Sequence, residues 1–120
     1  AKVGKMDIKT RDHRHVVIFD IDGEISRSEM PEPTLHQQVK ERLERGKRDI
    51  LLNLKNVGFI DSFGIGEILA SYVSTQNLGG KLKLCHVSKK LYLLFQVTML
   101  VRVLEIYDDC DDALKSFEAL

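Results

Sequence analysis

A serine hydroxyl stands between a carboxylate and two glycines in the run Asp61-Ser62-Phe63-Gly64-Ile65-Gly66. The apolar spacing that follows predicts an amphipathic helix, with Ser62 at its start. Free backbone N–H groups and the helix dipole favour negative charge at such an end. The chemistry predicted here is acceptance of a phosphate by Ser62. Its neighbours would form a switch or docking loop made of Asp61, Phe63, Gly64, Ile65 and Gly66.

The two glycines are unusual because each costs a helix about 1 kcal/mol relative to alanine. Their presence in the first turn predicts that the backbone approaches something closely. One explanation is a tight loop packed against a neighbouring strand, and the other is an exposed Ser62 placed to receive a phosphate. Phe63 also has two possible settings. It is either part of an exposed docking patch or packed against the adjoining loop.

A competing chemistry comes from Val16–Gly23, an apolar strand that ends in Asp20-Ile21-Asp22-Gly23. It resembles the nucleophile motif of haloacid-dehalogenase-like phosphatases, in which the first Asp attacks phosphate and the second handles a proton beside Mg²⁺. Glu24 stands where Thr or Val is usual, and no clear downstream lysine motif appears. This phosphatase is therefore the weaker reading. It predicts Mg²⁺-dependent activity that is lost in Asp20→Asn.

Other potential ligand sites give little. Gly64-x-Gly66 lacks the third glycine or the lysine that a nucleotide loop needs. The four histidines show no zinc spacing, and the acidic residues 108–112 are explained more simply as a helix start. Cys85 and Cys110 lie far apart and form no C-x-x-C pair, so we expect reduced, structural thiols. No cofactor, no metal and no catalysis are predicted.

The apolar pattern alternates between strand and helix spacing along the chain. Strands are expected at 6–10, 16–21, 50–54, 81–84 and 103–106, with turns at 11–14 and 55–58. Helices are expected after the cap residues Thr34 and Ser88, from the Ser62 region to Gly79-Gly80, and after the acidic run. For the second helix the predicted buried face is Ile65, Ile68, Leu69, Tyr72 and Val73, opposite Glu67, Ser71 and Ser74. This order predicts an α/β fold with a mixed sheet of four to five strands and about four helices.

Composition fits one globular domain. The chain has 120 residues, 43% of them hydrophobic, and 18 basic residues balance 18 acidic ones. A net charge of zero gives no reason to expect nucleic acid as a partner. No apolar run is long enough to span a membrane, and a cytoplasmic location is expected. We expect residues 1–5 to be a tag remnant or disordered, and residues 6–120 to form the domain.

The residues around Ser62 resemble a known family. Val57–Leu69 is similar to the D-S-x-G-x-G-x-L signature of the STAS domain, in its anti-sigma-factor antagonist branch. The likeness extends to the strand and turn at Val16–Glu24, to Gly79–Leu84, and to the closing pattern from Leu100 through Leu114. It covers the chain from about Met6 to Phe117. The combination is more specific than any single motif.

The resemblance implies a mechanism. Unphosphorylated antagonists capture an anti-sigma factor, often itself a serine kinase, and so free a sigma factor. Phosphorylation of a serine in the signature, which matches Ser62 here, breaks the capture, and a phosphatase restores it. The partners it implies are thus an anti-sigma factor with serine-kinase activity and a phosphatase acting on phosphorylated Ser62.

Two departures from the family pattern affect the detail. Many relatives carry a second Ser or Thr where this chain has Phe63, so Ser62 is the only hydroxyl in the signature. Relatives also often show an acid after Gly-Glu-Leu, where this chain has Ser26. Recognition by a kinase would then differ, or the chain would serve another partner. The alternative within the same fold is a scaffold or sensor subunit without reversible phosphorylation.

Overall fold

The computed structural model describes residues 5–118. The predicted remnant, residues 1–5, lies outside them except for Lys5. The chain opens with a hairpin of β1 (Asp7–His13) and β2 (Val16–Ile25), paired antiparallel. The turn predicted at residues 11–14 is wrong in its bounds, because β1 continues to His13 and Arg14 makes the turn with a positive φ of 58°. Cross-strand pairing keeps the polar residues of β1 extended.

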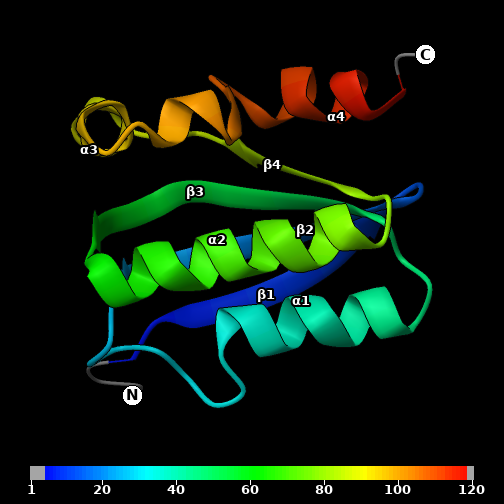
Figure 1. The fold of residues 1–120 in the computed structure, drawn as a ribbon, viewed down its shortest axis with the longest axis horizontal. Helices are drawn as coiled ribbons and strands as arrows, with labels where there is room; N and C mark the ends of the chain where they lie inside the picture. Colours follow the sequence, from blue (N-terminus) through cyan, green and yellow to red (C-terminus); the bar gives the residue numbers. More distant parts are fainter. Residues whose placement is uncertain (1–4, 119–120) are drawn as a thin grey trace.

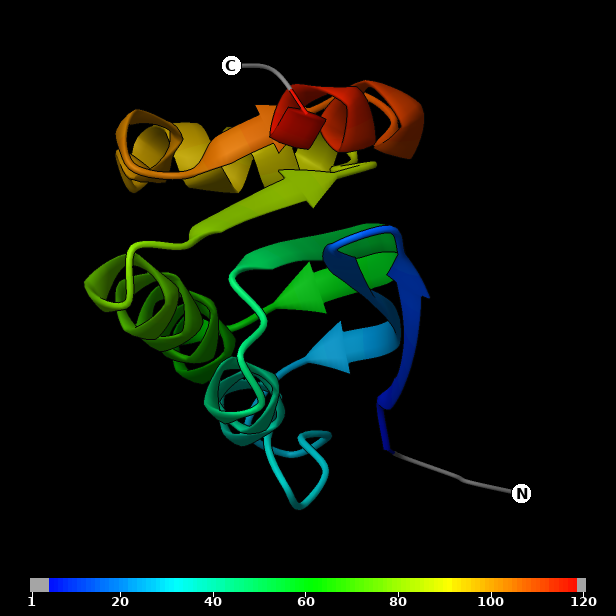
Figure 2. The ribbon, with the colours of Figure 1, turned by 90° about the vertical axis from the view of Figure 1, so that its right-hand side faces the viewer.

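Five strands form one sheet in the order β1-β2-β3-β4-β5, which confirms the predicted mixed α/β sheet. β3 (Asp49–Ile60), β4 (Lys81–Cys85) and β5 (Glu105–Tyr107) follow β2 in parallel pairings. The sheet twists from the blue hairpin to β4 and the short β5 (Figures 1 and 2).

β3 is much longer than predicted. The turn expected at residues 55–58 is wrong, because these residues stay paired with the second half of β2. Register shifts after Asp20 and Gly23 accommodate the mismatch between the two strands. Bulges of this kind keep polar and glycine residues within a strand. As a result β2 and β3 both end beside the start of the helix that follows β3, which begins at Ser62.

Three helices cover one face of the sheet. α1 (Leu35–Glu44) starts at the predicted cap, where Thr34 and Gln37 form a capping box, and it buries Leu35, Val39 and Leu43. α2 (Ser62–Asn77) packs beside α1, and both lie on the same side of the strands in Figure 2. α3 (Lys89–Val97), capped by Ser88, adds Leu91 and Phe95 to this core.

Four of the five residues predicted for the inner face of α2, Ile65, Ile68, Leu69 and Tyr72, pack against the main core, but the helix is rotated relative to the prediction. Its buried residues are Gly64, Ile68, Ser71 and Thr75, whereas Val73 is 51% exposed. Ser71 was expected on the opposite, outer face and is instead fully buried, with its hydroxyl donating to the Glu67 carbonyl oxygen at 2.8 Å. Small residues at these positions bring α2 close to the strands. Backbone proximity, and not apolar character alone, therefore sets its rotation.

The opposite face of the sheet is covered at one end by α4 (Cys110–Glu118), which follows the short 3-10 helix Leu100–Arg102 and β5. The acidic run starts this helix as predicted, with the Asp109 side chain accepting from the Asp112 N–H at 2.8 Å. Lys83 in β4 is only 3% exposed because α4 covers it. Its ammonium group is 2.8 Å from the Ser116 hydroxyl and 3.1 Å from a Glu105 carboxylate oxygen. Burial of this lysine is therefore matched by partners.

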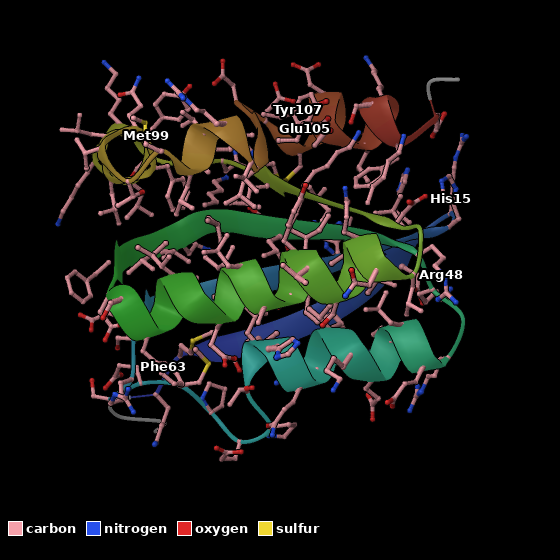
Figure 3. All side chains as sticks on the ribbon, in the orientation of Figure 1. His15, Arg48, Phe63, Met99, Glu105 and Tyr107 are labelled. Carbon is pink, nitrogen blue, oxygen red and sulfur yellow. A yellow bond between two sulfur atoms is a disulfide. The ribbon has the colours of Figure 1, made fainter. Side chains whose placement is uncertain are left out.

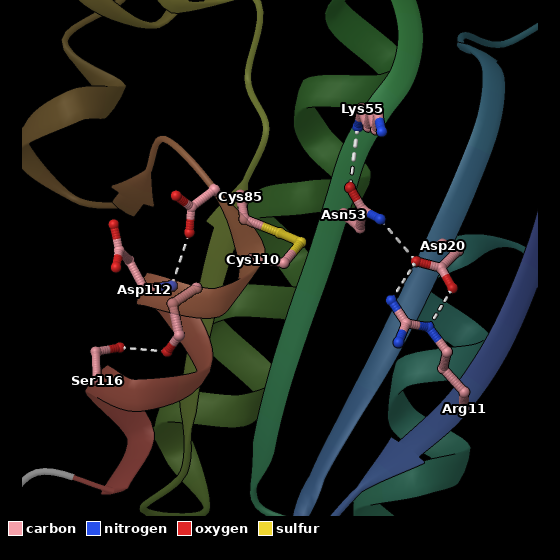
Figure 4. The surroundings of a disulfide bond; sticks show 10 residues. Arg11, Asp20, Asn53, Lys55, Cys85, Cys110, Asp112 and Ser116 are labelled. Atoms are coloured by element: carbon pink, nitrogen blue, oxygen red, sulfur yellow. Dashed lines mark hydrogen bonds and ion pairs between the residues drawn. A yellow bond between two sulfur atoms is a disulfide. The ribbon is translucent and has the colours of Figure 1, made fainter.

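A disulfide joins Cys85, the last residue of β4, to Cys110, the first residue of α4 (Figure 4). The prediction of two reduced thiols is thus wrong for this structure. The two residues are 25 positions apart in sequence, but the fold brings their Cα atoms to 5.2 Å. That separation lies within the range that a disulfide can bridge.

Among residues 5–118, no helix is both long enough and apolar enough to cross a membrane.

Candidate functional site

Ser62 is the first residue of α2, and its side chain is exposed. Asp61 caps the helix: one carboxylate oxygen accepts from the Gly64 N–H at 2.8 Å, and the other accepts from the Arg27 N–H at 3.0 Å. These two N–H groups, that of Arg27 first, hold the pKa of the Asp61 carboxyl below its usual value. The helix start is therefore fixed by a negative cap next to an accessible hydroxyl.

Gly64 supplies the close approach that its sequence position predicted. A Cβ atom added here would lie 1.8 Å from the Ile25 carbonyl oxygen and 2.8 Å from its carbonyl carbon. The Asp61 N–H donates to the same oxygen at 3.3 Å. Gly66 is different, because it is exposed and a Cβ atom there would meet nothing within 4 Å. The first glycine therefore serves the fold, whereas the fold makes no such demand for the second.

Of the two settings that the sequence left open for Phe63, the structure shows the packed one, with part of the ring still accessible. Its side chain is half-buried and packs against the edge of the main core. The Arg27 guanidinium carbon lies 4.7 Å from the centre of its ring, so the aromatic face is partly covered by a cation. Figure 3 labels Phe63 at the lower left, at the end of the molecule where α2 begins.

The end of β2 is thus part of the site. Arg27 contacts both sequence neighbours of Ser62, through its backbone N–H to Asp61 and its side chain to Phe63. Sequence reasoning missed Arg27, since it lies 34 positions before Asp61 and belongs to no motif. Ser26, which stands where relatives often have an acid, is buried at 3% exposure, with its hydroxyl 3.5 Å from that of Ser28.

Ile65, the remaining residue of the predicted switch loop, is half-buried and packs against the main core, so its role in the structure is to anchor α2. Phe59, near the end of β3, is 43% exposed. The Phe59 ring therefore leaves apolar surface open to solvent, three residues before Ser62 in the sequence. The described site therefore combines an exposed hydroxyl, an open glycine and accessible aromatic surface.

The competing phosphatase motif has a different setting. Asp20 lies within β2 and faces Arg11 of β1 and Asn53 of β3, as Figure 4 shows. Its carboxylate oxygens lie 2.6 Å from Arg11 Nε and 2.7 Å from Asn53 Nδ2. Arg11, and to a smaller degree Asn53, lower the pKa of the Asp20 carboxyl. β2 continues past Asp20, and two neighbouring side chains occupy its carboxylate oxygens. These are features of a structural ion pair.

Within residues 5–118, no group of three or more histidine, cysteine, aspartate or glutamate side chains gathers in a way that could hold a metal ion. His36 is used structurally: its Nε2 lies 2.9 Å from the Ser74 hydroxyl, which links α1 to α2. The Gly64-x-Gly66 segment forms the first turn of α2 and not a separate loop. The residues brought together at this end of the molecule are those of the Ser62 signature.

Comparison with known proteins agrees with this geometry. Residues 7–113 match the family model described as STAS domain. The chain belongs to the STAS domain family. It is 31% identical over 118 residues to the anti-sigma F factor antagonist of Paenibacillus polymyxa, covering 96% of this chain and 97% of that protein.

Solved structures show the same fold. An anti-sigma factor antagonist from Mycobacterium paratuberculosis superimposes with a TM-score of 0.82 at 21% identity, covering 96% of each chain. The Bacillus cell fate determinant SpoIIAA in its phosphorylated form superimposes with a TM-score of 0.70 at 18% identity, covering 92% of this chain and 99% of that one. At these identities the likeness concerns the fold. The predicted STAS fold is therefore confirmed.

Proposed function

We propose that this STAS domain is an anti-sigma-factor antagonist that captures an anti-sigma factor when Ser62 is free and releases it when Ser62 is phosphorylated. The observation that carries the proposal is the exposed Ser62 hydroxyl at the start of α2, in a chain 31% identical to an anti-sigma F factor antagonist. The phosphorylated SpoIIAA structure supports it, because a protein of this fold exists in a phosphorylated form.

The electrostatics of the site support a switch. A phosphate on Ser62 adds about −1.5 to −2 charges at pH 7, next to the carboxylate of Asp61. In the free protein this charge stays in water and faces the positive end of α2, so it costs the fold little. In a docked complex the same charge would be desolvated and repelled by nearby acids. Phosphorylation therefore weakens the complex far more than it weakens the fold.

The surface around Ser62 suits protein docking. The exposed part of Phe59 and the open position at Gly66 let a partner approach the first turn of α2 closely. Exposed aromatic side chains are enriched at the centres of protein interfaces. The proposed docking loop accordingly contains Ser62 with Asp61, Phe63, Gly64, Ile65 and Gly66. In this role the protein binds and is not a catalyst, and it acts in the cytoplasm, where sigma factors engage RNA polymerase.

Three variants test the proposal. Ser62→Ala is expected to capture the anti-sigma factor with or without kinase and ATP, and Ser62→Asp to capture it at least tenfold more weakly. Gln76→Glu is the matched control, because it adds one negative charge to an exposed position at the far end of the same helix. It should bind like the wild type. Equal binding by Ser62→Asp and the wild type would contradict the proposed switch.

The partner itself is tested by recovery from bacterial lysate on immobilised wild-type protein. We expect a histidine-kinase-like ATPase that phosphorylates Ser62, identified by mass spectrometry after incubation with ATP, and a phosphatase that reverses the reaction. Phosphate found only at other residues would remove Ser62 from the mechanism. Recovery of self-assembled protein alone would favour the scaffold alternative.

A further inference from the structure

The guanidinium group of Arg27 lies over the ring of Phe63, the residue that follows Ser62. Within the described residues 5–118 the guanidinium group makes no hydrogen bond or ion pair. Its carbon lies 4.7 Å from the centre of the Phe63 ring, and its charge helps to lower the pKa of the Asp61 carboxyl. The Arg27 side chain is exposed, and its backbone N–H is fixed to the Asp61 carboxylate at 3.0 Å. Its five N–H donors are therefore available to a new partner at the residue next to Ser62.

The backbone around Arg27 is not free to drift away from α2. Ile25, two residues before Arg27, accepts the Asp61 N–H through its carbonyl oxygen and packs against the backbone of Gly64. Ser26 and Ser28, on either side of Arg27, have their hydroxyl oxygens 3.5 Å apart. The segment is thus anchored at its backbone, while the guanidinium group at its tip can exchange one exposed contact for another.

We propose that Arg27 is the residue that receives the phosphate on Ser62: its guanidinium group leaves the ring of Phe63 and binds the phosphate oxygens. The proposal rests on Ser62 being the phosphorylated residue and adds the group that reads the modification. A guanidinium–phosphate pair has two parallel charge-assisted hydrogen bonds, whereas an exposed cation–π contact is one of the weaker electrostatic interactions. The exchange therefore favours the phosphate.

The consequence is a second change at the docking surface. Phosphorylation adds negative charge at Ser62 and also removes the cation that covers Phe63 in the unmodified protein. A partner that docks on the stacked Arg27 and Phe63 would lose both the positive charge and the covered ring at once. Arg27 affects partner docking only through its contacts with the phosphate and with Phe63.

The test uses protein carrying phosphoserine inserted at position 62 during translation, so that neither a kinase nor a partner is needed. The pH titration of the phosphate is followed by ³¹P NMR at low salt. A nearby cation favours the dianion, so Arg27→Gln should raise the midpoint of the second ionisation by about half a pH unit. Arg45→Gln is the control, since Arg45 is exposed at the C-terminal end of α1, the end of the molecule opposite the start of α2 (Figure 1). It should leave the midpoint unchanged.

The ring of Phe63 gives a second readout. Its NMR signals should shift on phosphorylation of the wild type and stay constant in Arg27→Gln, because only the wild type has a guanidinium group to withdraw. Identical ³¹P midpoints in Arg27→Gln and the wild type would overturn the proposal, and so would ring signals that do not respond to the phosphate in the wild type. These NMR measurements need no binding partner, so they can succeed even if the protein captures no anti-sigma factor. Failure of the proposed function and failure of this inference can therefore be told apart.

Discussion

Alanine at Gly64 and at Gly66 should affect stability in opposite directions. In Gly64→Ala the new Cβ atom would meet the Ile25 carbonyl oxygen at 1.8 Å and the Ile25 Cγ2 atom at 3.0 Å. The first of these atoms is backbone, so either β2 or α2 must move. Overpacking of this kind costs about 1 to 3 kcal/mol, and the short distance places this case at the upper end. Alanine returns about 1 kcal/mol of helix propensity, which leaves a net loss of about 2 kcal/mol.

Gly66→Ala is the matched variant, because it lies two residues later in the same helical turn. Its Cβ atom would meet nothing within 4 Å. The helix propensity of alanine is then gained without a clash, so the free energy of unfolding should rise by up to about 1 kcal/mol. The two variants should therefore differ by about 3 kcal/mol, although both make the same chemical change.

Urea unfolding followed by far-ultraviolet circular dichroism measures this difference. With a slope of about 2 kcal/mol per molar urea, the two midpoints should lie about 1.5 M apart, with Gly64→Ala below the wild type and Gly66→Ala at or above it. Slopes that agree between the variants would show that the native state alone has changed. A Gly64→Ala protein as stable as Gly66→Ala would refute the claim that Gly64 is required by the contact with Ile25.

Three further predictions follow from the caps and the disulfide. Asp61→Asn should be less stable than the wild type at pH 7. Because folding lowers the pKa of Asp61, the stability that its charged form contributes is lost as pH falls through the folded pKa, and the difference between the two proteins should shrink below about pH 4. A constant difference from pH 7 to pH 3 in urea titrations would contradict this. Changing both Cys85 and Cys110 to serine should lower the free energy of unfolding by about 3 kcal/mol, the value that loop closure predicts for their spacing. A reducing agent should destabilise the wild type and leave the double variant unchanged. Thiols that react with an alkylating reagent in the native protein without reductant would show that the disulfide is absent. Thr34→Ala should cost about 1 kcal/mol in thermal unfolding, since it removes the capping box of α1, and an unchanged melting temperature would show that the cap contributes nothing.

The sequence predicted those features that local physical chemistry decides. The caps at Thr34 and Ser88 and the helices that follow them depend on residues within one or two turns of each other, so their patterns can be recognised in the chain. The close approach at Gly64 was also predictable, because a glycine in a helix start has a cost that some contact must justify.

The features that the sequence did not predict depend on partners from distant segments. Residues 55–58 look like a turn, but pairing with β2 keeps them extended. Lys83 has the alternation of an exposed residue, but α4 from the end of the chain buries it and supplies Ser116. The disulfide required the spatial proximity of β4 and α4, which no spacing of two cysteines reveals.

The same reasoning applies to the site. Ser62 and its loop stand in one continuous stretch of chain and could be recognised there, whereas Arg27 reaches them from the end of another strand. A short polar segment such as Ser26–Ser28 shows no periodicity, so its place beside α2 appears only when β2 and β3 are aligned to the same end.

In the proposed switch, one phosphate on Ser62 controls partner binding without unfolding the domain. Isothermal titration calorimetry of the recovered anti-sigma factor measures this with two forms of the protein, one unmodified and one carrying phosphoserine inserted only at position 62. Thermal unfolding of both forms is recorded alongside. We expect melting temperatures within a few degrees of each other and a dissociation constant at least tenfold larger for the phosphorylated form. Equal dissociation constants for the two folded forms would contradict it.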